Sequence, residues 1–422
     1  MNKQTEIVRQ SLKRRYRKER RFRVLGLTAV SVGFLFLGFL LGDIVSKALP
    51  AFSSTEIRLS LPMDRDSLGL PADAPVTEQT LSQVNWQGLI KKSLRELFPD
   101  IRKRKQKKQL YKLVSSGAEF ELRDRVAAHP EWIGGPAREF WLKADDDVDT
   151  WYKLETRVSR ISPLQSEILE TLERDGRLRS VFNIGLFTHG DSREPEMAGI
   201  RGALAGSFWT LLVTMLLTLP IGIAAALYLE EFAPRNRITD FIEVNINNLA
   251  AVPSIVFGLL GLAVFINFFG LPRSAPLVGG LVLALMTLPT IIISARAAIK
   301  SVPPSIKEAA YGLGASRMQV VFHHVLPLSM PGILTGAIIG MAQALGETAP
   351  LLMIGMVAFI VDIPQGIFDS ATVLPVQIYL WSDSPERAFT ALTSATILVL
   401  LGFLAIMNAL AIFLRKHFER RW

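Results

Sequence analysis

Long apolar stretches are the feature that most constrains how this 422-residue chain can fold. Six of them approach or exceed the roughly 20 mainly apolar residues that a helix needs to cross a bilayer. The backbone of a segment in lipid must satisfy its own hydrogen bonds, so each stretch is expected to be helical. The sequence therefore predicts a mainly α, polytopic membrane protein with six transmembrane helices, at Val24–Gly42, Ala203–Tyr228, Leu249–Phe269, Ala275–Ala298, Met330–Ile360 and Ala388–Leu414.

Positive charge beside these stretches predicts their orientation. Residues 1–23 form a basic tail with ten Lys and Arg side chains, and Arg415, Lys416, Arg420 and Arg421 follow the last stretch. Because Lys and Arg concentrate in cytoplasmic segments, both termini are predicted to be cytoplasmic. Residues 24–47 form the first transmembrane anchor, which has no small-residue cleavage site and is interpreted as uncleaved. Because the first span crosses the membrane from a cytoplasmic N-terminus, residues 48–199 are predicted to lie on the opposite, external side.

The overall charge adds little beyond this orientation. The net charge of +9 resides mainly at the membrane-flanking ends, where it meets anionic membrane lipid, so nucleic acid is not an expected partner. The chain has no cysteine, which excludes a disulfide framework and cysteine-ligated zinc.

Residues 48–199 are predicted to form an external insert with a mixed α/β fold. Apolar residues alternate as in a strand over Thr55–Leu61 and recur at helical spacing over Leu164–Leu178. The basic cluster Arg102–Lys108 has two interpretations, a surface that attracts anions or acidic proteins and a solvated helix face. The acidic run Asp145–Asp149 lacks the spacing and the glycine of a calcium loop, so no metal site is predicted.

The motifs of common catalytic sites do not occur in the sequence. We find no phosphate-cradling loop for ATP, no nucleophile elbow and no zinc-binding helix motif. His323 and His324 are adjacent and would point in different directions on a helix. The chain is therefore predicted to be no enzyme and to hold no cofactor, so that any ATP and Mg would be bound by a partner ATPase.

A charged loop, residues 301–327, separates two of the apolar stretches on the predicted cytoplasmic side. Ser305 and Glu308 stand in the S-x-x-E relation of a capping box, which predicts a helix with Ala309 and Ala310 on its surface. Gly312 and Gly314 should end this helix.

The second half of the loop is expected to be a separate short helix. Ser316 and Gln319 form a second capping pair, and Pro327 should stop this helix from continuing into the next apolar stretch. We therefore expect a compact helical elbow that another protein can approach closely.

The spacing of this loop resembles the EAA loop of ATP-binding-cassette (ABC) importer permeases. Glu308-Ala309-Ala310, Gly314 and Leu326-Pro327 match that pattern, and His324 stands where relatives usually carry an aliphatic residue. The resemblance implies that a cytoplasmic ATPase dimer docks on the elbow. The coupling residues would be Ser305, Glu308, Ala309, Ala310, Gly314, Leu326 and Pro327.

The fifth apolar stretch contains an ionisable residue, Glu347, which at membrane depth is a functional-site hypothesis by default. Gln343 lies four residues earlier, so the two side chains would share a helix face. Gly336, Gly340 and Ala344 would leave this face open to close packing. We interpret Gln343, Glu347 and Thr348 as lining a translocation path or a contact with a second permease; a structural role for Glu347 is the alternative.

Three further segments resemble the A-type permease subunits of phosphate ABC importers. They are ALYLEEFAP at residues 226–234, AAVPSIVFGLLG at 250–261 and ALGETAPLL at 344–352. Relatives often carry Arg at the position of Gln343, so a partner permease would have to supply that cation. Arg296, near the cytoplasmic end of its span, is expected to extend to the membrane interface.

The resemblance implies that residues 200–422 form a type I ABC permease domain that imports inorganic phosphate across the bacterial inner membrane. The implied partners are a second permease subunit, the ATPase dimer and a periplasmic phosphate-binding protein. A permease for sulfate or molybdate and a polytopic membrane sensor are the alternatives.

Overall fold

The computed structural model describes residues 3–71, 75–153 and 160–418, so Arg420 and Arg421 of the C-terminal basic cluster lie outside it. Five helical segments are long and apolar enough to cross a membrane, and a bent helix pair would make a sixth crossing. The predicted mainly α class is confirmed. The helices concerned are α1 (Lys3–Ala48), α10 (Arg201–Leu227), α13 (Pro276–Lys300), α16 (Leu326–Gly346) and α19 (Ala388–Phe418).

The bent pair occupies the region of the third predicted span. α11 (Arg237–Ala250) meets α12 (Ser254–Gly261) at 99°, and the π-helix η5 (Leu262–Phe268) continues α12. The predicted single helix Leu249–Phe269 is therefore wrong at its start. Pro253 has no N–H to donate and disfavours a helical conformation at Val252, which explains the break.

The fifth predicted span, Met330–Ile360, is also displaced. α16 ends at Gly346, Glu347 is extended with φ −85° and ψ 119°, and the short helix α17 (Ala349–Met353) follows. Pro350 cannot donate to the carbonyl of Gly346, and its ring would clash with that carbonyl in a continuous helix. The helical run that is long and apolar enough to cross a membrane begins earlier, at Arg317.

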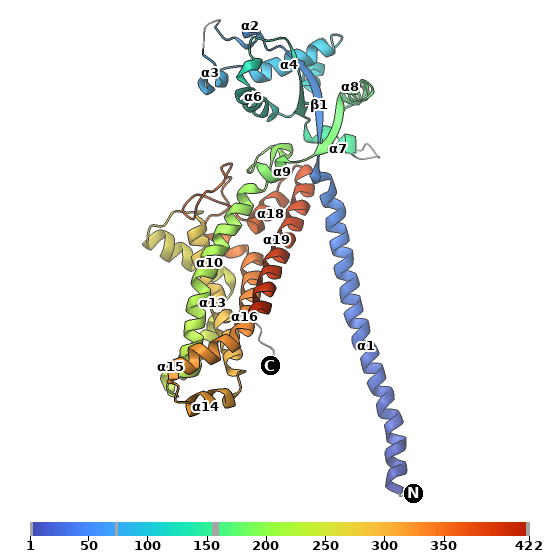
Figure 1. Ribbon diagram of the computed structural model, residues 1–422. Coiled ribbons are helices and arrows are strands. Elements are labelled where there is room, and N and C mark those ends of the chain that lie inside the picture. The colour runs from blue at the N-terminus through green and yellow to red at the C-terminus, as the bar shows by residue number, and fades with distance from the viewer. Residues whose placement is uncertain (1–2, 72–74, 154–159, 419–422) are drawn as a thin grey trace.

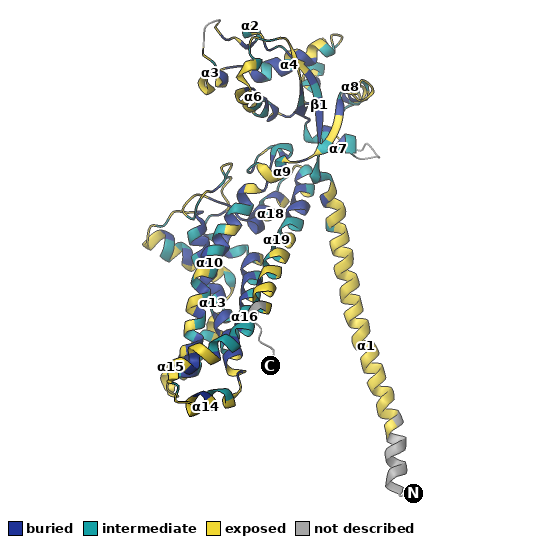
Figure 2. Cartoon of the chain, in the orientation of Figure 1, coloured by how far each residue is buried: buried dark blue, intermediate teal, exposed yellow. Residues whose placement is uncertain are grey.

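The central bundle consists of α10, α13 and α16, against which α18 (Leu374–Ser382) and α19 pack (Figure 1). α13 is the most enclosed of these helices, and its buried Val278, Val282 and Met286 belong to the main apolar core of the bundle. α1 contacts α19 only near its C-terminal end and then diverges from the bundle, so that nearly all of its described side chains are exposed (Figure 2).

The insert folds around a three-stranded antiparallel sheet with the order β2-β1-β3. The strands are β1 (Ser53–Leu61), β2 (Arg138–Lys143) and β3 (Leu178–Phe182). Ile57, Leu59 and Leu61 are fully buried, which confirms the predicted strand alternation. The helix predicted over Leu164–Leu178 is present as α8 (Pro163–Arg174), but its predicted end is wrong, because Leu178 is the first residue of β3.

Short helices cover this sheet and lead into the bundle. The α-helices are α2 (Arg65–Leu68), α3 (Glu78–Ser82), α4 (Trp86–Leu97), α5 (Arg104–Tyr111), α6 (Ala118–Ala128), α7 (Asp146–Lys153) and α9 (Gly185–Thr188). The 3₁₀ turns are η1 (Leu49–Phe52), η2 (Pro130–Trp132) and η3 (Pro195–Met197). The predicted mixed α/β character of the insert is confirmed.

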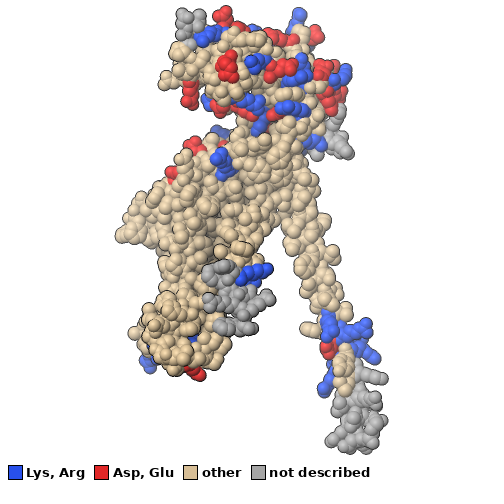
Figure 3. All heavy atoms as spheres, in the orientation of Figure 1, with Lys and Arg blue, Asp and Glu red and all other residues tan. Residues whose placement is uncertain are grey.

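Charged side chains are seen on the insert, on the N-terminal half of α1 and at the end of the bundle that lies opposite the insert (Figure 3). The helices between these regions show an almost uncharged surface. An uncharged surface suits contact with lipid, because a charged side chain inside the bilayer is energetically costly.

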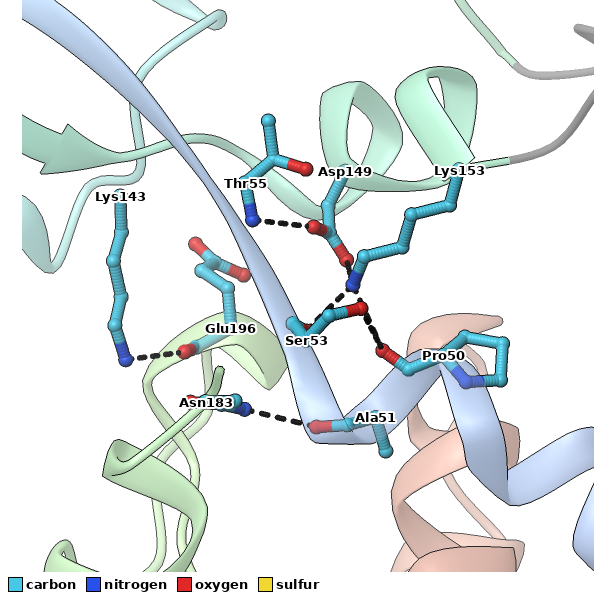
Figure 4. Close-up of polar contacts among 9 residues, drawn as sticks. All are labelled: Pro50, Ala51, Ser53, Thr55, Lys143, Asp149, Lys153, Asn183 and Glu196. Carbon is cyan, nitrogen blue, oxygen red and sulfur yellow. Dashed lines mark hydrogen bonds and ion pairs between the residues drawn. The ribbon is translucent and has the colours of Figure 1, made fainter. Parts of the chain in front are cut away.

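Lysine and asparagine side chains fasten the insert to the end of the first span (Figure 4). Lys153 Nζ donates to the carbonyl oxygens of Pro50 at 2.8 Å and Ser53 at 2.6 Å, and Asn183 Nδ2 donates to Ala51 O at 3.1 Å. Lys143 Nζ donates to Glu196 O at 3.0 Å. The bonds from Lys153 and Asn183 satisfy backbone carbonyls where η1 turns into β1, and the bond from Lys143 satisfies one in η3.

Candidate functional site

The predicted elbow lies at the end of the bundle opposite the insert (Figure 1). It comprises α14 (Pro304–Gly312), α15 (Arg317–Val320) and the π-helix η6 (Val321–Val325). Gly314, at φ +84°, forms the turn between α14 and α15. This left-handed conformation favours glycine because a side chain would clash with the backbone.

Of the two capping boxes predicted here, one is present. Ser316 Oγ accepts from Gln319 N at 3.4 Å, and Gln319 Oε1 accepts from Ser316 N at 2.9 Å. The Ser305–Glu308 box is wrong, because α14 begins at Pro304 with Pro303 as its N-cap. Proline suits the first helical position, which moves the helix start ahead of Ser305.

The surface of α14 differs from the prediction at one residue. Ser305, Glu308 and Ala309 are exposed, but Ala310 is 6% exposed and packs in the apolar cluster that joins the elbow to α10 and α13. The prediction that Ala310 lies on the surface is therefore wrong. Gly314 has no neighbouring atom within 4 Å of an added Cβ, so its outer side is open.

Four large apolar side chains on the elbow face solvent, and sequence reasoning missed them. Leu313 is 92% exposed, and Tyr311, Met318 and Phe322 are about half exposed. Exposed apolar residues concentrated on a polar loop are typical of a protein contact. These four apolar residues stand in a loop otherwise rich in charged and small residues, and this contrast could have indicated a contact surface from the sequence.

The predicted break at Pro327 is also wrong. α15, η6 and α16 run on as one helical segment from Arg317 to Gly346, and Pro327 is the second residue of α16. The backbone N–H of Leu326 bonds to Val321 O, a π-type turn five residues long. The wider turn accommodates the proline ring and its missing donor.

The predicted path residues lie at the far end of α16. Gln343 is half-buried, and its Oε1 accepts a hydrogen bond from Thr290 Oγ1 of α13 at 3.2 Å. Glu347 and Thr348 are half-buried in the interruption between α16 and α17. The prediction that Glu347 lies inside a continuous helix is wrong. Its backbone N–H donates to Ala344 O at 3.4 Å, whereas its carboxylate makes no hydrogen bond or ion pair with another described residue.

The small residues beside Gln343 serve packing within the chain. A Cβ on Gly336 would overlap the side chain of Ser294, and one on Gly340 would lie 3.3 Å from Ile291 Cγ1. Both contacts are with α13. The face that was expected to remain open to another helix is therefore occupied by α13 at these positions.

Arg296 forms ion pairs with two carboxylates. Its Nε donates to Glu230 Oε1 at 2.7 Å, and its Nη2 donates to Glu243 Oε1 at 2.7 Å. Two carboxylates from neighbouring segments therefore pair with this charge, and the expectation that Arg296 extends to the membrane interface stays a prediction. Glu230 follows α10 in the π-helix η4 (Tyr228–Phe232), and Glu243 belongs to α11.

The acidic run of the insert lies away from the elbow and the path. The carboxylate oxygens of Asp145, Asp146 and Asp147 lie within 4.8 Å of one another. Burial raises the pKa of Asp145 to about 7, and the neighbouring carboxylate of Asp146 adds to that rise. Asp149 pairs instead with Lys153. No second feature of the described residues indicates a ligand here, so the expectation of no metal site stays a prediction.

Two family models match separate parts of the chain. The family described as binding-protein-dependent transport system inner membrane component matches residues 218–422, and a domain of unknown function, DUF3333, matches residues 9–160. Among solved structures, the inward-facing MetNI methionine ABC transporter covers 52% of this chain and 96% of its own, with 17% identity and a TM-score of 0.40.

Curated relatives match part of the chain. Phosphate transport system permease protein PstA 1 of Mycobacterium tuberculosis is 32% identical over 248 residues, which are 57% of this chain and 80% of that protein. PstA of Haemophilus influenzae is 29% identical over 57% of this chain and 82% of that protein. Probable ABC transporter permease protein YqgI of Bacillus subtilis is 41% identical over 155 residues, and the chain spans only 52% of its length. This chain belongs to the family of binding-protein-dependent transport system inner membrane components, the permease subunits of ABC transporters, which are not themselves enzymes.

Proposed function

We propose that this chain is one permease subunit of an ABC importer that moves inorganic phosphate across the bacterial inner membrane. The similarity to the PstA permease of M. tuberculosis, at 32% identity over 80% of that protein, carries the proposal. That relative and the PstA protein of H. influenzae are both named for phosphate transport.

The elbow is the proposed docking surface for a cytoplasmic ATPase dimer. Its exposed Leu313 and Tyr311 would enter an apolar groove, and the open side of Gly314 would allow close approach. ATP and Mg would be bound by that ATPase. Its closure would push on the elbow and move the bundle between outward-open and inward-open states.

The proposed path uses the polar groups at the end of α16. Gln343 Oε1 is engaged by Thr290, which leaves the amide N–H groups of Gln343 free to donate to a phosphate oxygen. A bare Glu347 carboxylate would repel phosphate, so it requires a proton or a nearby cation. The second permease subunit would supply that cation, and a periplasmic phosphate-binding protein would deliver the substrate.

Reconstitution tests this function directly. The chain would be placed in proteoliposomes with a second permease, the ATPase and the binding protein, and ATP-dependent uptake of radiolabelled phosphate would be measured. Excess sulfate or molybdate should not compete, and vesicles without ATP are the control. Uptake of sulfate or molybdate in place of phosphate would instead support the alternative oxyanion permease.

A further inference from the structure

Two consecutive glutamates, Glu230 and Glu231, lie where α10 ends, in the π-helix η4. Neighbouring residues of a helix point in different directions, so the two carboxylates can bond to different parts of the molecule. Glu231 is 8% exposed, although it is charged. A buried charge persists in a fold only when partners compensate for its lost hydration.

Glu231 is bonded to both helices of the elbow. Its carboxylate pairs with Lys307 of α14, and its backbone carbonyl accepts from the guanidinium of Arg317 of α15. The same guanidinium lies over the ring of Phe232, 5.2 Å from its centroid. Glu231, together with Phe232, therefore holds both α14 and α15 to the end of α10.

Glu230 is bonded in the opposite direction, toward the bundle. It accepts from Arg296 of α13 at 2.7 Å, and Arg296 also donates to Glu243 of α11 at 2.7 Å. The three side chains are largely shielded from solvent, since Arg296 and Glu230 are 20% and 18% exposed and Glu243 is 36% exposed. Partial burial makes these pairs less screened than pairs in open water.

α11 continues this connection toward the predicted path. It bends by 99° into α12, and α12 packs against α17, the helix that follows Glu347 and Thr348. The backbone of Gly258 lies so close to Pro350 that an added Cβ would be 2.7 Å from Pro350 Cα. Contacts thus extend from the elbow through Glu231 and Glu230 to α13, α11 and the helices beside the path.

We infer that Glu230 and Glu231 mechanically couple the elbow to the membrane helices: Glu231 holds α14 and α15, and Glu230 transmits their displacement through Arg296 to α13 and α11. Both are positioning residues. The inference rests on the proposed function, in that it assumes an ATPase docked on the elbow. Docking itself would use the outer, apolar side of the elbow, which these ion pairs leave untouched.

The first test separates docking from transmission. Glu231→Gln and Lys307→Met should retain the co-purified ATPase at wild-type amounts, while uptake per assembled complex falls about tenfold, which corresponds to about 1.4 kcal/mol of coupling free energy. Lys300→Met is the matched control. Lys300 is exposed at the C-terminal end of α13, just before α14, and has no partner among the described residues. The charge exchange Glu231→Lys with Lys307→Glu should recover part of the lost uptake, which a merely structural role would not predict. Equal uptake by Glu231→Gln and the wild type, or loss of the ATPase along with uptake, would overturn the inference.

The second test does not depend on the identity of the substrate. Nitroxide labels at Arg235→Cys, just after η4, and His323→Cys, in η6, can be placed specifically because the chain has no native cysteine. ATP binding to the assembled complex should leave the distance between the labels unchanged when Glu231 is present. In Glu231→Gln the distance distribution should shift or broaden. Identical distributions in the two proteins would refute the coupling role, whereas absence of phosphate uptake in the wild type would refute only the proposed substrate.

Discussion

Gln343 and Glu347 differ in their surroundings, although both belong to the predicted path. The side chain of Gln343 is held by Thr290 of the neighbouring helix, while Glu347 ends its helix with a carboxylate that has no partner among the described residues. A carboxylate in that position gains most if a cation from another subunit meets it. This difference makes Glu347 the more informative position to change.

Glu347→Gln should lower phosphate uptake per assembled complex about tenfold or more, because it leaves the opposing cation without a partner, while assembly stays intact. Gln343→Arg, which introduces the cation that the family resemblance implies at this position, should be tolerated. Uptake is measured in proteoliposomes and normalised to co-purified ATPase. Should uptake per complex stay unchanged in Glu347→Gln, that carboxylate has no part in transport.

The stability of the insert should depend on pH through two half-buried carboxyl groups, those of Asp145 and Glu196. Burial raises the pKa of Asp145 to about 7 and that of Glu196 to about 7. Between about pH 4 and pH 7 the folded insert then holds protons that the unfolded chain has released, so stability falls as pH rises through this window.

Thermal unfolding of the full chain in detergent, followed by tryptophan fluorescence, should therefore give a lower midpoint at pH 8 than at pH 5.5. The signal comes largely from the insert, which holds four of the seven tryptophans, Trp86, Trp132, Trp141 and Trp151. Glu196→Gln should reduce the difference between the two midpoints, and Glu96→Gln, at an exposed position, should not. A midpoint that rises with pH would contradict the assignment.

At the scale of elements, the elbow depends on the turn at Gly314 and on the π turn that follows. Gly314 has φ +84° and an open outer side, so its substitution tests the docking surface with little effect on internal packing. A side chain at Gly314 should destabilise the turn only modestly, because an L-residue in the left-handed region is disfavoured by about 1–2 kcal/mol.

Gly314→Glu should leave the chain inserted in the membrane but reduce the co-purified ATPase to background, because a bulky charge cannot enter a close contact. Gly314→Ala is the control for backbone strain, and it should retain most of the ATPase. Pull-down of tagged ATPase against the amount of permease in the membrane gives the ratio. If Gly314→Glu retains a wild-type ratio, the docking surface lies elsewhere.

The whole molecule has its insert at one end and its elbow at the other, with an almost uncharged surface between them (Figure 3). This separation makes the orientation in the membrane testable with single cysteines. Ser116 is exposed on the insert and Ser305 is exposed on the elbow, whereas Ser115 is buried and would label poorly.

In intact spheroplasts, a membrane-impermeant maleimide should label Ser116→Cys and should reach Ser305→Cys only after the membrane is disrupted. The cysteine-free parent chain provides the background. The opposite pattern would reverse the predicted orientation, with the termini outside and the insert in the cytoplasm.

The sequence by itself determined the features that depend on local physics. Apolar length predicted the helical class, alternation predicted β1, and the Ser316–Gln319 pair predicted a cap, because each depends on residues that are close along the chain. The loop motif also located the elbow. Proline effects were predicted less well: Pro253 and Pro350 interrupt helices where apolar composition suggested continuity, and Pro327 does not interrupt one because a π turn accommodates it.

Only the tertiary structure decided which side of a helix is buried and which side is exposed. Ala310 is buried because it faces α10 and α13, and Leu313 is exposed because nothing in the described part of the chain covers it. The partners of Glu230 and Glu231 lie 66 and 76 residues away in the sequence. Such pairings depend on which helices pack together and at what depth, and the free energy that selects them comes from burial and charge compensation between distant segments, which no local pattern encodes.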